Sequence, residues 1–131
     1  MAASNLPIYP KTPAVGVANI SAAVTGLTVT GTTGLTQVLA AGADGTRIDS
    51  VDVKATATVT AGMVRLWLYS GSGNAQLFDE IPVAATTPSG TVPAFTATRH
   101  YQTLVIPTGY SLYASTNNAE AFNVRAQGGH F

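Results

Sequence analysis

The amino-acid sequence predicts an all-β domain, a β-sandwich with the eight strands of a jelly roll, together with an extended N-terminal arm. Three observations support this prediction. From residue 27 onward apolar and polar residues alternate with a period of two, turn-forming residues recur about every 8–12 positions, and no segment shows helical periodicity. An immunoglobulin-like sandwich is the alternative, because strand order cannot be deduced from one sequence.

The arm is expected to span residues 1–26 and the sandwich residues 27–131. Pro7, Pro10 and Pro13 recur at a regular spacing near the N-terminus. Proline restricts its own φ and disfavours helical backbone at the preceding residue, so an extended, polyproline-like chain is favoured here.

The arm also contains a candidate partner-binding segment, formed by Leu6, Pro7, Ile8, Tyr9 and Pro10. Large apolar side chains gathered this closely are unusual in a solvated tail, which suggests that the segment docks on another protein. The alternative is a frayed terminus, since chain ends are often poorly ordered.

The clearest strand is expected within residues 47–60, where Val and Ala alternate with polar residues. Such alternation is typical of a strand with one face in the core and the other in solvent. Ile48 is out of phase with Val51, which predicts a bulge near Ser50.

The short turn at residues 60–62 predicts a hairpin with a second strand over residues 63–69. A third strand is expected over residues 75–84, and Pro82 favours an edge position for it because proline cannot donate a hydrogen bond. The other expected strands span residues 95–106, 110–115 and 121–127, with weaker ones at 27–30 and 36–40.

The charge content restricts the classes of function. Charged residues make up 9% of the chain, against about 25% in an average soluble protein, and the six basic and six acidic side chains cancel. Nucleic-acid binding needs clustered Lys and Arg, so no nucleic-acid partner is expected. No apolar stretch reaches the ~20 residues of a membrane span, so no membrane partner is expected. Without cysteine, disulfides and thiol chemistry are excluded.

Histidine is sparse, and neither copy indicates a catalytic or metal site. His100 lies within an expected strand, where a hydrogen bond at the strand surface is the simplest role. His130 has no second metal ligand at a useful sequence spacing. We therefore expect no metal site, no cofactor and no catalytic residue, and the protein is not expected to be an enzyme.

The carboxylates add little to the case for chemistry. Asp44, Asp49 and Asp52 lack the D-x-D-x-D-G spacing of a calcium-binding loop. Asp79 and Glu80 are adjacent, so they point to opposite faces of a strand, which is poor geometry for a paired general acid and base.

The alternation over residues 63–69 places Arg65, Trp67 and Tyr69 on one face. Aromatic side chains can stack on sugar rings, so this face is a candidate glycan-binding site. The same residue types are enriched at protein interfaces, and an oligomer interface or the second layer of the sandwich is the simpler interpretation.

Two segments, Thr46-Arg-Ile-Asp-Ser-Val-Asp-Val-Lys54 and Met63-Val-Arg-Leu-Trp-Leu-Tyr69, resemble small structural proteins encoded by tailed bacteriophages. A third, Leu104-Val-Ile-Pro-Thr-Gly-Tyr-Ser-Leu-Tyr-Ala-Ser115, resembles the closing strands of viral jelly rolls. The resemblance spans residues 36–127. It implies a virion protein on the outer capsid surface, a decoration or cement protein that binds the major capsid protein, bridges its subunits and forms homotrimers.

The composition is compatible with that role. A surface with few long charged side chains loses little side-chain entropy when it is ordered in an interface, and an extended arm can add a strand to a neighbour. One alternative is a tail-tip or fibre knob protein, and locating the protein on the virus particle would distinguish it from a decoration protein. The other alternative is a carbohydrate-binding module. The latter would lose glycan binding in Trp67→Ala.

Overall fold

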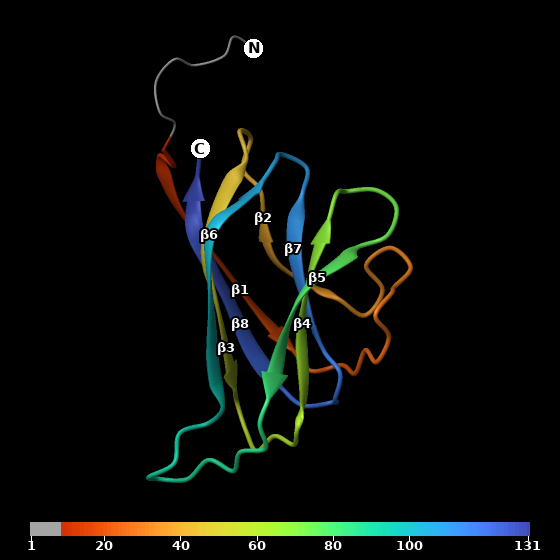
Figure 1. Cartoon of the computed structure of the whole chain (residues 1–131), viewed down its shortest axis with the longest axis vertical. Coiled ribbons are helices and arrows are strands. Elements are labelled where there is room, and N and C mark those ends of the chain that lie inside the picture. Colours follow the sequence, from red (N-terminus) through yellow and green to blue (C-terminus); the bar gives the residue numbers. More distant parts are fainter. Residues whose placement is uncertain (1–8) are drawn as a thin grey trace.

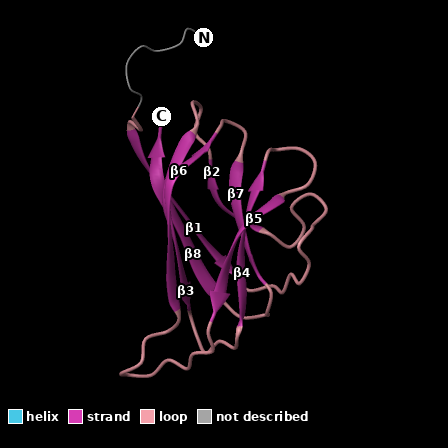
Figure 2. Cartoon of the chain, in the orientation of Figure 1, coloured by secondary structure: helices cyan, strands magenta, loops and turns pink. Residues whose placement is uncertain are grey.

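The computed structural model describes residues 9–131, and all of the regular structure in this range is β-strand (Figures 1 and 2). There is no helix here that could span a membrane. The strands are β1 (Thr12–Ile20), β2 (Thr36–Ala40), β3 (Thr46–Ala55), β4 (Gly62–Tyr69), β5 (Gln76–Val83), β6 (Thr96–Ile106), β7 (Ser111–Thr116) and β8 (Phe122–His130).

The strands form two four-stranded antiparallel sheets. Sheet A has the order β1-β8-β3-β6, and sheet B has the order β2-β7-β4-β5. The first strand therefore pairs with the last, the second with the seventh, the third with the sixth and the fourth with the fifth. This nesting is that of one long hairpin wrapped into two layers, which is the jelly roll. The fold prediction is confirmed, and the immunoglobulin-like strand order is excluded.

The core lies between the sheets and is filled mainly by aliphatic side chains. In β3, Val51, Val53 and Ala55 are buried, while the intervening residues are at least partly exposed, as the alternation predicted. Phe122 on β8 supplies the largest side chain of this cluster.

The predicted bulge near Ser50 is present. Between Ile48 and Ser50 the register of β3 shifts against both β6 and β8. An extra residue in one strand changes which face the following side chains occupy. The shift therefore allows Ile48 and Val51 both to reach the core although they are out of phase.

The predicted hairpin between residues 47–60 and 63–69 is wrong, because β3 belongs to sheet A and β4 to sheet B. Residues 56–61 cross from one layer to the other, and Val59 is buried on the way, bridged to Thr86. Two strands with one apolar face each can bury those faces side by side in a sheet or opposite each other across a core. The alternation is the same in both cases.

The sandwich begins earlier in the chain than the sequence indicated. β1 lies within the segment assigned to the arm, and it pairs with β8 over its whole length. Its inward positions are largely small residues, which gave only a weak strand signal: Ala14, Ala18 and Ile20 are buried. The weak strand expected at residues 27–30 is absent, and that stretch belongs to the connection between β1 and β2.

The remaining expected strands are present. β5 is the edge strand of sheet B, as Pro82 suggested. β8 continues three residues beyond the expected end at residue 127, through Gly128 and Gly129 to His130.

Candidate functional site

The base of the N-terminal arm is held at one end of the sandwich. Leu6, Pro7 and Ile8 lie outside the described residues, whereas Tyr9 is 69% exposed and Pro10 is half-buried. The backbone N–H of Lys11 donates to the carbonyl oxygen of His130 at 2.8 Å.

The end of β8 is in turn tied to the connection between β2 and β3. The Thr46 hydroxyl accepts a hydrogen bond from the N–H of Gly42 at 2.9 Å and lies 2.6 Å from Nδ1 of His130. The N–H of Phe131 donates to the carbonyl oxygen of Gly45 at 3.1 Å. The base of the arm, the end of β8 and the connection between β2 and β3 are thus joined to one another by hydrogen bonds.

The candidate face formed by Arg65, Trp67 and Tyr69 is not an exposed aromatic surface. Trp67 has no exposed area, and its indole N–H donates to Oγ of Ser115 at 2.9 Å. Tyr69 is half-buried and makes an edge-to-face contact with Tyr113, at 5.9 Å between ring centroids. Sugar stacking requires an accessible ring face, so Trp67 cannot serve as a glycan platform in this structure.

The connection between β1 and β2, residues 21–35, lies on the outer side of sheet B (Figure 1). Two contacts at its first half involve Val24: its N–H donates to the carbonyl of Thr116 at 2.9 Å, and its carbonyl accepts from Nη1 of Arg65 at 3.3 Å. Further on, the carbonyl of Gly31 accepts from the N–H of Ala75 at 2.8 Å. The chain itself thus contacts Arg65 on this face through the carbonyl of Val24.

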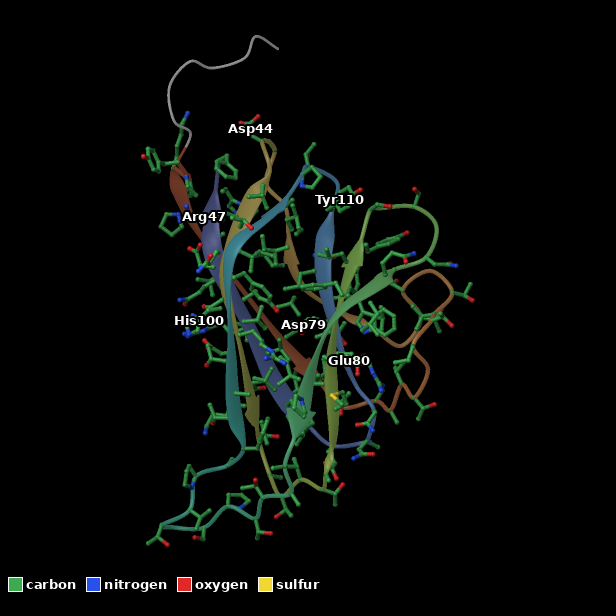
Figure 3. The ribbon with its side chains drawn as sticks, in the orientation of Figure 1. Asp44, Arg47, Asp79, Glu80, His100 and Tyr110 are labelled. Atoms are coloured by element: carbon green, nitrogen blue, oxygen red, sulfur yellow. The ribbon has the colours of Figure 1, made fainter. Side chains whose placement is uncertain are left out.

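A charged cluster that the sequence did not reveal joins the edge strands of the two sheets. Its members are Asp79 and Glu80 on β5, Arg65 on β4, and Arg99 and Tyr101 on β6. Nη2 of Arg99 donates to the carbonyl oxygen of Glu80 at 2.7 Å, and its Nε lies 3.5 Å from Oδ2 of Asp79. Nε of Arg65 lies 3.7 Å from Oε2 of Glu80. Figure 3 labels Asp79 and Glu80 on β5, and their side chains lie on opposite faces of this strand, because Glu80 is paired in register with Arg65 and Asp79 with Leu66.

Tyr101 completes this cluster. Its hydroxyl donates to Oδ2 of Asp79 at 2.8 Å, and its ring packs on Phe78 with centroids 6.0 Å apart. Burial raises the pKa of the Tyr101 phenol well above its ordinary value, and the hydrogen bond to Asp79 and the carboxylate charge raise it further. The phenol is thus a hydrogen-bond donor at neutral pH. Through Arg99 and Tyr101, the cluster holds β5 and β6 together by side-chain contacts.

A second ion pair lies on the outer face of sheet A. Nε of Arg125 donates to Oδ2 of Asp52 at 3.0 Å, and the Thr98 hydroxyl donates to Oδ1 at 2.8 Å. Partial burial acts to raise the pKa of the Asp52 carboxyl. The hydrogen bonds from Arg125 and Thr98, with the charges of Arg125 and His100, outweigh it and hold that pKa below its ordinary value.

The remaining candidate residues are dispersed. His100 is exposed on β6, and Asp49 is paired with Arg47 at 2.8 Å. Asp44 lies at the tip of the connection between β2 and β3 (Figure 3). Asp52 is bound to Arg125. Among residues 9–131 no three His, Asp or Glu side chains gather as a metal site.

Comparisons with known proteins find little. No protein-family model matches the chain, and no curated protein matches it. Among solved structures, a chain of the "Cyanophage Pam1 capsid asymmetric unit" aligns with 12% sequence identity over 100% of this chain and 93% of that chain, with a TM-score of 0.45. A similarity at this level establishes neither a family nor a function.

Proposed function

We propose that the protein is a structural component of a tailed-bacteriophage virion, a decoration or cement protein that binds the outer capsid surface and bridges capsid subunits. The proposal starts from the resemblance of residues 46–54, 63–69 and 104–115 to phage structural proteins. The observation that carries it is the way in which the fold uses its charges.

Each of the four arginines is paired with a carboxylate of the same chain: Arg47 with Asp49, Arg65 with Glu80, Arg99 with Asp79 and Arg125 with Asp52. Three of these pairs join two different strands, whereas Arg47 and Asp49 both lie on β3. The surface that the sandwich offers to a partner therefore consists of hydroxyl, amide and small apolar groups together with ion pairs that are already neutralised within the chain.

Such a surface suits permanent attachment to a protein shell. Threonine and alanine lose little conformational freedom when an interface orders them, and a neutral surface avoids the cost of desolvating unpaired charge. A shell-stabilising protein needs contact area and shape complementarity, and a rigid jelly roll supplies both.

The direct test is binding to shells assembled from the major capsid protein of the phage that encodes this chain. We expect the protein to sediment with these shells in a saturable manner and to raise the temperature at which they disrupt. Bovine serum albumin at the same concentration serves as the control for trapping in the pellet. Shells that neither retain the protein at saturating concentration nor gain heat resistance would contradict the proposal.

The arm contributes a separate prediction. Removing residues 2–8 eliminates Leu6, Pro7 and Ile8 but leaves β1 whole, because β1 begins at Thr12. We expect the truncated protein to keep the unfolding midpoint of the full chain and to bind shells at least about tenfold more weakly, a loss of about 1.4 kcal/mol. Equal affinity of the two proteins would show that the arm is not a binding segment.

A further inference from the structure

On the basis of the proposed function, we infer which part of the molecule contacts the capsid shell. It is the end of the sandwich formed by the connections 41–45, 70–75 and 107–110 together with the base of the arm. We call this surface the arm end. Its occupant is an uncharged area of the shell protein, and Tyr9 and Pro10 at the base of the arm lie in the same contact.

The length of the arm limits where on the molecule a partner can contact it. Lys11 is hydrogen-bonded to His130 at the end of β8, so the arm leaves the sandwich at a defined point. Leu6 precedes Lys11 by five residues, which span at most about 18 Å when fully extended. β1 alone extends about 30 Å, so the segment cannot reach the opposite end. A partner that contacts Leu6 must therefore lie within about 18 Å of Lys11, in the half of the molecule that carries the arm end.

The arm end is one continuous surface. The N–H of Ala41 donates to the carbonyl oxygen of Tyr110 at 2.9 Å, which joins the connections 41–45 and 107–110. A Cβ placed on Gly71 would lie 3.2 Å from the carbonyl oxygen of Gly109, so the connection 70–75 touches the same group. Figure 1 shows the three connections at the end where the arm emerges.

The arm end carries exposed aromatic side chains and little charge. Tyr110 is 36% exposed and Tyr9 is 69% exposed, and aromatic side chains of this kind are typical anchors of protein interfaces. Within the described part of the arm end, charge is limited to Lys11 and Asp44, which cancel. Recognition by aromatic contact and hydrogen bonds predicts binding that changes little with salt concentration.

The opposite end provides the matched control. There the connection between β5 and β6, residues 84–95, projects from the sandwich (Figure 1), and Val92 on it is 45% exposed. Val92→Asp and Tyr110→Asp therefore introduce the same charge at exposed side chains of opposite ends. Asp44→Lys is a third variant, at an exposed position where no packing is altered.

The experiment measures shell binding of the full-length protein and these three variants by sedimentation, at 50 mM and 500 mM NaCl. Thermal unfolding verifies that each variant folds. We expect Tyr110→Asp and Asp44→Lys to bind at least about tenfold more weakly, and Val92→Asp to stay within about twofold of the parent. The parent's affinity should differ by less than about threefold between the two salt concentrations.

The outcomes separate the two proposals. If the parent protein binds shells and Val92→Asp loses affinity while both arm-end variants keep it, the assignment of the arm end is overturned and the proposed function stands. If the parent protein does not bind shells, the proposed function itself fails.

Discussion

Gly16 shows at the scale of one residue how the fold closes. It lies on β1 opposite β2, and a Cβ at this position would lie 1.9 Å from the carbonyl oxygen of Val38. No side chain fits there without moving backbone, because the two edge strands meet at this point. This explains a glycine in the middle of a strand, where it otherwise weakens pairing.

We expect Gly16→Ala to lower the free energy of unfolding by about 3 kcal/mol, since the clash is with backbone and cannot be relieved by a rotamer change. Urea denaturation measures this difference. Gly90→Ala is the control, because a Cβ at Gly90 meets nothing within 4 Å and the backbone there is not left-handed. Equal stability of the two variants would contradict the close approach.

Asp52 leads to a prediction about pH. Its pKa in the folded protein lies below the ordinary value of 3.8, so the ionised carboxylate stabilises the folded state. That contribution is fully present above pH 3.8 and is lost as the pH falls through the lower pKa of the folded state. Because the pair with Arg125 is largely solvent-exposed, it contributes only about 0.5–1 kcal/mol.

We therefore expect Asp52→Asn to be less stable than the parent at pH 6, with the difference shrinking below pH 3.8. Urea denaturation at a series of pH values measures it, and the exposed Asp44→Asn provides the comparison. A stability difference that persists unchanged at pH 2.5 would rule out ionisation of Asp52 as the cause.

At the scale of elements, the charged cluster between β5 and β6 closes the second open side of the sandwich. No backbone pairing joins these two edge strands, so side chains hold them together. Tyr101 matters most because its hydroxyl donates to a charged acceptor in a partly buried site, where a hydrogen bond is worth more than at the surface.

We expect Tyr101→Phe to lower the free energy of unfolding by about 1.5–2 kcal/mol. The matched control is Tyr113→Phe, which removes a hydroxyl bonded at 3.2 Å to the uncharged side chain of Gln37 at an exposed site. Its effect should be below about 0.5 kcal/mol. Urea denaturation measures the loss of unfolding free energy in both variants. Equal losses would show that the charged cluster does not hold the two sheets together.

For the whole molecule, the jelly roll explains how strands far apart in sequence become neighbours. β1 and β8 are adjacent in sheet A, and the arm therefore emerges beside the end of the last strand. This arrangement gathers the base of the arm, the end of β8 and three connections on a single surface.

The homotrimer implied by the resemblance is a prediction at this scale. Light scattering coupled to size-exclusion chromatography should give a mass three times the 13.3 kDa of the chain. The measurement should be repeated over a tenfold range of concentration, because a stable trimer keeps its mass on dilution. A mass of one chain at every concentration would contradict the trimer.

Much of the fold could be predicted from the sequence, because the positions of strands, bulges and edge strands are encoded in patterns of neighbouring residues. Alternation indicates that one face of a strand is apolar. The strand expected over residues 63–69 agrees with β4 to within one residue, whereas the alternation expected over residues 47–60 continues past the end of β3 at Ala55. The out-of-phase Ile48 predicted the bulge at Ser50, and Pro82 predicted an edge strand. These are properties of consecutive residues and need no knowledge of distant ones.

The partners of each strand were decided only by the tertiary structure. β3 and β4 were predicted to pair, yet they face each other across the core, because alternation is the same for both arrangements. β1 was missed because its inward side chains are small, and their small size is explained only by the approach of β2.

The candidate site divides in the same way. The apolar segment at residues 6–10 is visible in the sequence, whereas the complete burial of Trp67 is seen only in the structure, where its indole N–H bonds Ser115 on another strand. Local sequence thus determined which residues are extended and which face of each strand is apolar. Only the tertiary structure decided which faces are covered and which end of the molecule carries the arm, since both depend on contacts between residues distant in the chain.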